Sequence, residues 1–341
     1  MMNKVLYTPE GYIDMRALIM NERSPFIFIT SLRGPGKTWG AIDYALRCQD
    51  KPFILMRRTQ VQADFAAAPA TTPLAANLRD DEYLEPVKTG VKNFAQLNVM
   101  QKADPEDVLV GTCYIIALST VATMRGISLM GCDILIFDEF IKEPHERPIK
   151  EEYLAFTHAY ETINRNRESQ GRPALKVIAL SNALDLANPY YRGFDMVNKV
   201  YAMTSEILRD PDQGVAIYRP RCQEFWRRKK TGVLYKLRGT QRTSAGDWAD
   251  MNLDKVKSLR LKSSAVPICS INGVGFWKVN GEGYASAIRP NGVPAYDLDD
   301  RIDVAAVHMK NQGLINALFN RKVIFESVDI MLRCGELVQR L

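Results

Sequence analysis

The chain has 341 residues, enough for two domains, and its mix of apolar and charged residues is typical of a globular protein. Lys and Arg exceed Asp and Glu by 45 to 39, so the net charge of +6 is only mildly basic. The six cysteines form no Cys-x-x-Cys pair, and with three histidines they provide no zinc framework. No apolar run reaches membrane-spanning length, and Met1–Tyr12 lacks the apolar core of a signal peptide. We therefore expect a soluble, intracellular protein with reduced thiols and no membrane partner.

The stretch from Pro25 to Thr38, PFIFITSLRGPGKT, organises the first part of the chain. Its apolar beginning, Phe26–Ile29, predicts a strand, and residues 39–46 predict a helix. Between them, Gly34 and Gly36 allow consecutive backbone N–H groups to point at one anion, to which the helix adds its positive end. The pattern is that of a phosphate-binding loop.

Two side chains of this loop have predicted roles. Lys37 can reach the β- and γ-phosphates of a nucleotide, and Thr38 can ligate Mg²⁺. Ser31 stands where the usual pattern has glycine, so the first turn of the loop has to accommodate a Cβ atom. Taken alone, the stretch is also compatible with a glycine-rich turn before a helix.

A second decisive stretch is Asp133–Phe140, DILIFDEF. Ile134–Phe137 predicts a buried central strand, and two carboxylates follow at its C-terminal end. Asp138 would hold Mg²⁺, and Glu139 would polarise the attacking water. The alternative is an acidic loop after a core strand.

Two further polar groups follow predicted elements. Residues 150–164 predict a helix that leads into Arg165 and Arg167, which indicates either an arginine finger acting on a neighbouring subunit or a cationic helix terminus. Residues 176–180 predict another buried strand, and the polar pair Ser181-Asn182 after it would orient the lytic water, sense the γ-phosphate or simply form a turn.

The remaining elements complete an α/β pattern. A second strand at 52–56 ends in Arg57 and Arg58, a pair that would face nucleotide, a neighbouring subunit or only solvent. Strands are also predicted at 108–110 and 114–118, with a turn at Gly111-Thr112. We place the end of this first domain at residue 199, a linker at 200–231 and a small α+β domain at 232–341.

In the last domain we expect strands at 266–271, at 276–279 and near residue 284, and helices at 312–319 and 327–332. Its bunched acids, Asp297, Asp299, Asp300 and Asp303, indicate a loop or a helix cap rather than a two-metal site.

The succession SLRGPGKT, MRR, LIFDEF, INRNRE and LSNALDLANPY resembles the double-stranded DNA-packaging ATPases of small tailed bacteriophages. The resemblance covers about the first 200 residues strongly, and the last 110 only in size, predicted strand order and position. It implies a P-loop NTPase of the additional-strand, catalytic-glutamate type with a mostly parallel sheet, followed by a small α+β domain resembling a degenerate RNase H-like fold. It also implies a ring of five copies.

The resemblance implies ATP and Mg²⁺ as cofactors and a role for each matching residue. Glu139 would be the base, Arg165 the trans-acting finger, and Asp138 with Thr38 the metal ligands. The nucleotide-binding set would be Arg33, Gly34, Gly36, Lys37, Thr38 and Asn182, with Lys37 also catalytic. Arg33 and either Arg57 or Arg58 are weaker matches for phosphate or subunit-coupling roles.

We therefore predict a homomeric, pentameric ring that moves double-stranded DNA through the portal into an empty procapsid in the host cytoplasm. Whether a packaging RNA takes part stays open. The basic stretch Arg227, Arg228, Lys229 and Lys230 would hold DNA phosphates, unless it is only a solvated face. Two alternatives are a large-terminase-like enzyme that also cuts DNA, and a module whose nucleotide site only stabilises a structure.

Overall fold

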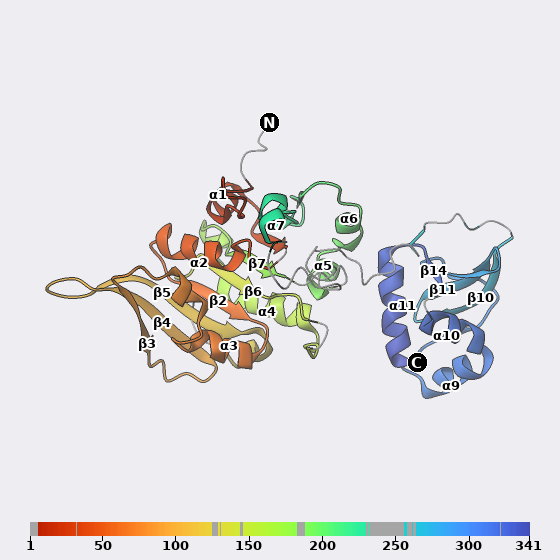
Figure 1. Cartoon of the computed structure of the whole chain (residues 1–341). Coiled ribbons are helices and arrows are strands. Elements are labelled where there is room, and N and C mark those ends of the chain that lie inside the picture. Colours follow the sequence, from red (N-terminus) through yellow and green to blue (C-terminus); the bar gives the residue numbers. More distant parts are fainter. Residues whose placement is uncertain are drawn as a thin grey trace. The chain divides into compact units, whose positions relative to one another are not determined.

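A computed structural model describes residues 6–31, 33–124, 129, 131–143, 146–182, 188–229, 231, 256–257, 261, 264–320 and 322–341. The chain forms two compact units (Figure 1). The first comprises Met1–Phe194 and Met203–Asp247, and the second comprises Asp195–Ala202 and Trp248–Leu341. No helix in the described ranges is both long enough and apolar enough to cross a membrane.

The first unit is built on a nine-stranded sheet of order β3-β4-β5-β2-β6-β7-β1-β9-β8. Its six central strands, β5-β2-β6-β7-β1-β9, pair in parallel. At the edges, β3, β4 and β8 pair antiparallel with their neighbours. The bounds are β1 (Phe26–Thr30), β2 (Phe53–Arg57), β3 (Glu82–Val87), β4 (Phe94–Gln101), β5 (Val108–Ala117), β6 (Ile134–Asp138), β7 (Lys176–Ser181), β8 (Ile207–Asp210) and β9 (Val215–Tyr218). The mostly parallel α/β sheet is therefore confirmed.

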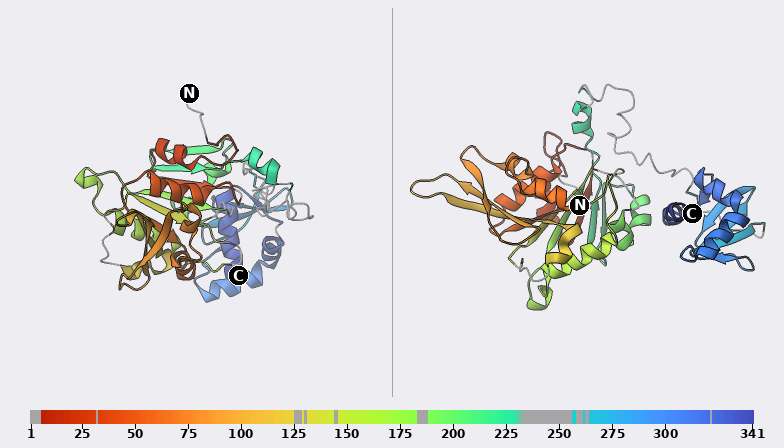
Figure 2. Two further views of the ribbon diagram at one scale, coloured as in Figure 1. Left: turned by 60° about the vertical axis from the view of Figure 1, so that its left-hand side comes forward. Right: turned by 90° about the horizontal axis from the view of Figure 1, so that it is seen from below.

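Helices cover both faces of this sheet because its central strands are apolar on both sides (Figure 2). Ile27 and Ile29 belong to the core that α1 and α2 bury, whereas the alternate residue Phe28 packs in an aromatic cluster with Phe140 and Tyr190. The helices are α1 (Met15–Asn21), α2 (Lys37–Arg47), α3 (Gln60–Ala67), α4 (Glu152–Asn164), α5 (Pro189–Gly193) and α7 (Gln223–Lys229), with 3₁₀ turns η1 (Pro73–Asn77), η2 (Leu118–Met124) and η3 (Glu168–Gln170).

The predicted end of the first domain at 199 and the linker at 200–231 are wrong. Residues 207–210 and 215–218 are β8 and β9, and β9 pairs in parallel with β1, Phe26 lying opposite Val215. A turn through Gly214, whose φ of +63° suits glycine, joins the two strands. The strands have four residues each, so their apolar pattern is too short to mark them in the sequence.

The turn predicted at Gly111-Thr112 is also wrong. Residues 108–117 form the single strand β5, in which Gly111 pairs with Val99 and Thr112 with Asn98 of β4. The hairpin of β3 and β4 that supplies this partner was not expected from the sequence.

The second unit contains a five-stranded sheet of order β13-β10-β11-β12-β14. Its elements are α6 (Val197–Tyr201), β10 (Val266–Ile271), β11 (Val274–Val279), β12 (Glu282–Ser286), β13 (Ala295–Tyr296), α9 (Arg301–Lys310), α10 (Gln312–Phe319), β14 (Ile324–Phe325) and α11 (Val328–Arg340). The predicted strands and helices of this region are confirmed, although α11 runs further than expected. Asp300 accepts a hydrogen bond from Ile302 N at 2.7 Å and caps α9, as expected for the aspartate-rich stretch.

Candidate nucleotide site

The loop between β1 and α2 has the backbone of a phosphate cradle. Gly34 and Gly36 have φ values of +97° and +91°, a left-handed conformation that favours glycine, and Gly36 is the N-cap of α2. Ser31 has no positive φ and is buried. Its Cβ is therefore accommodated where the usual pattern has glycine.

Lys37 is drawn into the loop and is only 5% exposed. Its Nζ donates to Ser31 O at 3.2 Å, to Ser31 Oγ at 3.0 Å and to Asn182 Oδ1 at 2.9 Å. Asn182 reaches it because β7 pairs with β1 and places Thr30 opposite Ser181. Burial lowers the pKa of Lys37 to about 8, so the ammonium is poorly solvated and suited to an anion.

The two carboxylates at the end of β6 face the same loop. Asp138 Oδ1 accepts a hydrogen bond from Thr38 Oγ1 at 2.9 Å. Arg57, at the end of the adjacent β2, forms ion pairs with both acids, through Nη1 to Asp138 and through Nη2 to Glu139 at 2.8 Å. One guanidinium therefore bridges the predicted metal ligand and the predicted base.

Glu139 stands in an unusual backbone and electrostatic position. It has a φ of +58°, which is uncommon for a residue with a side chain. Burial raises the pKa of Glu139, as does the neighbouring Asp138 charge, while Arg57 acts in the opposite direction. The carboxylate is therefore a stronger proton acceptor than an ordinary glutamate.

Arg58, the neighbour of Arg57, has a different environment. Its side chain is fully buried, with Nε 2.7 Å from Glu152 Oε1 and Nη1 2.9 Å from Glu146 Oε2. Tyr190 also donates to Glu152 at 2.9 Å. This network anchors the start of α4 to the end of β2. The sequence pair Arg57-Arg58 could not show which of the two faces the acids.

Of two further predicted residues, one is near this group and the other lies away from it. Arg33 is exposed and pairs with Glu143 at 2.8 Å, and its charge acts on both Lys37 and Glu139. Arg165 is exposed beyond the end of α4, where its neighbour Arg167 is buried and contacts Asp133 Oδ1 at 2.8 Å. Asp133 precedes β6, whereas Asp138 ends it, so within one chain Arg165 lies toward the opposite end of the strand from the acids.

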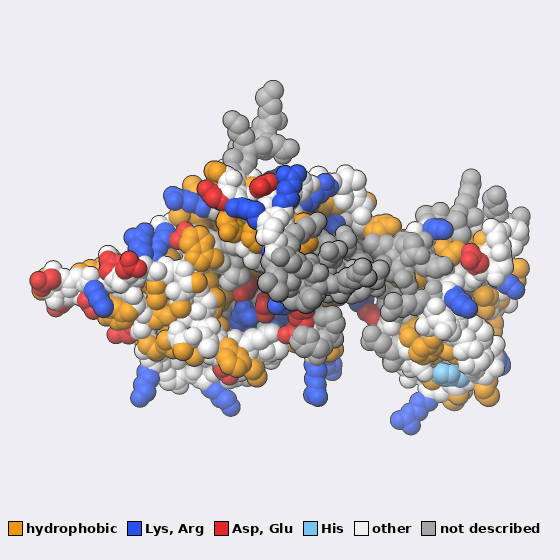
Figure 3. All heavy atoms as spheres, viewed as in Figure 1, with side chains coloured by type: hydrophobic (Ala, Val, Ile, Leu, Met, Phe, Trp, Pro, Cys, Tyr) orange, Lys and Arg blue, Asp and Glu red, His pale blue; other side chains and the backbone are white. Residues whose placement is uncertain are grey.

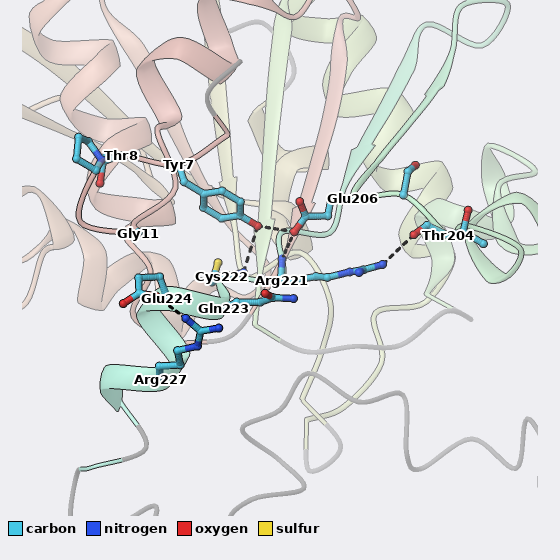
Figure 4. A pocket seen from close by; sticks show the side chains of 12 residues that line it. Tyr7, Thr8, Gly11, Thr204, Glu206, Arg221, Cys222, Gln223, Glu224 and Arg227 are labelled. Carbon is cyan, nitrogen blue, oxygen red and sulfur yellow. Dashed lines mark hydrogen bonds and ion pairs between the residues drawn. The ribbon is translucent and has the colours of Figure 1, made fainter. Parts of the chain in front are cut away.

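A cavity of about 610 Å³ lies between the N-terminal segment at 7–11 and the start of α7 (Figure 4). Its polar wall is tied together by Glu206, which accepts from Tyr7 Oη and from Arg221 N at 2.6 Å. Next to the cavity, Tyr12 and Phe225 of α7 pack against the phosphate loop, where Tyr12 approaches Gly36 and the Phe225 ring approaches Gly34. This wall was not predicted from the sequence, because the strands within residues 200–231 have only four residues each.

Three of the four basic residues predicted to hold DNA lie in the last turn of α7, in a region where Figure 3 shows Lys and Arg side chains. Arg227 pairs with Glu224 at 3.1 Å, and Arg228 lies over the Tyr12 ring at 5.8 Å. Lys229 instead turns to the phosphate loop, where its Nζ donates to the Arg33 carbonyl. Lys230 is outside the described residues. An acidic first turn and a basic last turn were the available signal for this helix.

A glycine cradle before a helix, a buried lysine and paired acids ending a neighbouring parallel strand define a P-loop nucleoside triphosphatase. The model of the podovirus DNA encapsidation protein (Gp16) family matches residues 2–256. The chain belongs to that family and is a phage DNA-packaging ATPase. The predicted family, ATPase activity and P-loop fold are thereby confirmed.

Two solved structures show a similar fold. One is the bacteriophage Phi-29 viral genome packaging motor assembly, with 21% identity over 96% of this chain and 99% of that chain and a TM-score of 0.64. The other is the Phi-28 gp11 DNA packaging motor, with 16% identity over 98% of each chain and a TM-score of 0.57. A comparison with curated protein sequences found no match. The RNase H-like character of the second unit stays a prediction.

Proposed function

We propose that the chain couples hydrolysis of Mg²⁺-bound ATP to movement of double-stranded DNA as a homomeric ring, pentameric by family resemblance. In this ring each nucleotide site is completed by Arg165 of a neighbouring copy. The observation that carries the proposal is the separation of Arg165 from the acids of its own chain.

That separation follows from the two elements between them. β6 has five residues and spans about 16 Å. α4 starts at the Arg58 network by the carboxyl end of β2 and has 13 residues, a length of about 20 Å. It returns to Asp133 at the amino end of β6. A guanidinium there is placed to reach another copy, where it would stabilise charge on a transferring phosphoryl group.

The residues of the loop account for nucleotide binding. The phosphates would lie on the amides around Gly34 and Gly36, with Lys37 opposing their charge and Asn182 holding the lysine in place.

The chemistry of two side chains fits Mg²⁺. Thr38 Oγ1 and Asp138 Oδ1 are both hard oxygen donors and lie 2.9 Å apart. When bound there, Mg²⁺ would neutralise phosphate charge. Arg57 contacts the other oxygen of this carboxylate, Oδ2, so Oδ1 would be the oxygen that holds the ion. Glu139 would accept a proton from the attacking water, a contribution of roughly 10²–10⁴ in rate.

DNA would be held through its phosphates by basic side chains that include Arg227 and Arg228, so binding would be sequence-independent and weakened by salt. In the host cytoplasm the ring would dock on the portal of an empty procapsid, with or without a packaging RNA. A nuclease function, as in a large-terminase-like enzyme, gains no support from the aspartates at 297–303, because Asp297, Asp300 and Asp303 hydrogen-bond local backbone N–H groups. A DNA-nicking assay with Mn²⁺ tests this alternative.

The oligomeric state of the Glu139→Gln chain with ATPγS tests the ring directly. We expect a closed oligomer by native mass spectrometry, and DNA-stimulated ATP turnover by the unsubstituted chain that is lost in Lys37→Ala. A monomer that hydrolyses ATP at the full rate, with no response to DNA, would refute the proposal.

A further inference from the structure

The end of α7 is fixed against the phosphate loop by aromatic contacts. A Cβ built on Gly34 would come within 3.1 Å of Phe225 Cζ, so the phenyl ring lies directly on the loop. Phe225 packs on Tyr12 with 5.4 Å between ring centroids, and the ammonium of Lys229 lies 5.5 Å from the Phe225 centroid. These contacts place the last turn of α7 at the rim of the predicted phosphate cradle.

Lys229 makes polar contact with the loop itself. Its Nζ donates to the Arg33 carbonyl and would be 3.4 Å from a Cβ on Gly34. A carbonyl oxygen carries only a partial charge, whereas a phosphate oxygen forms a stronger, charge-assisted bond with an ammonium. Because the lysine side chain is long and flexible, its ammonium can leave the Arg33 carbonyl and bind a phosphate oxygen on the same loop.

The charges around the loop favour an anionic occupant. Arg33, Lys37 and Lys229 surround one short turn. Two carboxylates offset part of this positive charge, since Glu143 pairs with Arg33 and Asp138 accepts from Thr38 beside Lys37. A triphosphate on the loop would relieve the remaining repulsion.

We infer that Lys229 is a phosphate-binding residue, which leaves the Arg33 carbonyl for an oxygen of the triphosphate bound on the loop. The inference rests on the proposed nucleotide site, and it replaces DNA contact as the role of Lys229.

Calorimetric titration of the full chain in a Glu139→Gln background tests this role, with ATPγS and adenosine as probes. We expect Lys229→Ala to weaken ATPγS binding about tenfold or more, because it removes a charge-assisted bond, and to leave adenosine binding unchanged. Lys229→Arg should restore most of the affinity. Lys102→Ala, which removes an exposed lysine after β4, should match the parent.

The outcomes separate the inference from the proposed function. If Lys37→Ala abolishes ATPγS binding and Lys229→Ala does not weaken it, only the inference is wrong. If Lys37→Ala also retains affinity, the nucleotide site itself is wrong. A purely structural contact with Arg33 would lower the melting temperature of the free Lys229→Ala protein and leave its ATPγS-induced increase intact, which would also overturn the inference. A reduced salt slope of nucleotide-free DNA binding in Lys229→Ala, with ATPγS affinity unchanged, would favour the original DNA role instead.

Discussion

The two ends of β6 use the same residue types for different purposes. At the amino end, Asp133 is shared by the exposed Lys51 and the buried Arg167, which also donates to the Cys132 carbonyl. At the carboxyl end, Asp138 and Glu139 share Arg57 beside an anion-binding loop. The same kind of ion pair, between an acid and an arginine, thus stabilises the fold at one end and belongs to a candidate reaction centre at the other. The neighbouring backbone makes the difference, since loops at the carboxyl ends of parallel strands form the ligand sites of open α/β sheets.

The largest expected effect comes from Arg165→Ala, which tests whether the amino end also contributes to reaction. We expect DNA-stimulated ATP turnover to fall roughly 10³–10⁵-fold, about 4–7 kcal/mol in the barrier. Stability to urea should not change, because Arg165 is exposed. The nearby Arg167→Ala is the matched control and should destabilise the fold, since it leaves the Cys132 carbonyl and Asp133 without a buried partner. Equal turnover in Arg165→Ala and the parent would show that Arg165 is not an arginine finger.

Next in size is Glu139→Gln at the carboxyl end. Turnover should fall roughly 10²–10⁴-fold because the amide cannot accept the proton of the attacking water. ATP affinity should be kept, since Lys37 keeps its bonds to Ser31 and Asn182 and the amide is nearly isosteric with the carboxylate. Phosphate release and ATP titration measure the two quantities. Turnover that survives the substitution would show that another group is the base.

The adjacent arginines Arg57 and Arg58 allow a structural ion pair and a candidate-site ion pair to be compared at the end of one strand. Arg58→Ala should lower the free energy of unfolding by about 3–5 kcal/mol, because it leaves the buried Glu152 carboxylate uncompensated. Arg57→Ala should cost far less stability and should instead alter turnover, since its partners are the candidate site acids. Urea unfolding followed by circular dichroism measures the stability of both variants, and phosphate release measures their turnover. The reverse ranking would mean that the two roles are misassigned.

The smallest expected effect is the pH dependence of nucleotide binding. Burial lowers the pKa of Lys37 to about 8, so above that pH the free protein increasingly holds a neutral amine. Bound phosphate favours the ammonium and so raises this pKa. ATPγS affinity of the Glu139→Gln chain should therefore be flat from pH 7 to 8 and fall up to about tenfold per pH unit above it. Constant affinity up to pH 9.5 would show that Lys37 does not oppose the phosphates.

The parts of the site that lie within one short stretch could be predicted from the sequence. Gly34, Gly36, Lys37 and Thr38 follow each other in the loop, and Asp138 with Glu139 ends a strand whose apolar run is unbroken. What failed depended on pairing between distant segments. The strand β9 can be identified only from its pairing with β1. The helix α7 can be assigned to the site only because it follows β9 and packs against the phosphate loop. Likewise, the register that sets Met56 opposite Phe137 brings Arg57 level with Asp138, and no local pattern carries that information.

The claim that a neighbouring copy completes each site is tested most directly by mixing two inactive variants. Arg165→Ala subunits keep Glu139, and Glu139→Gln subunits keep Arg165, so a mixed ring contains some interfaces with both groups. We predict that ATP turnover, absent from each variant alone, reappears in the mixture and is greatest near equal proportions. No recovery at any ratio, in mixtures shown by native mass spectrometry to contain both variants in one oligomer, would contradict the account.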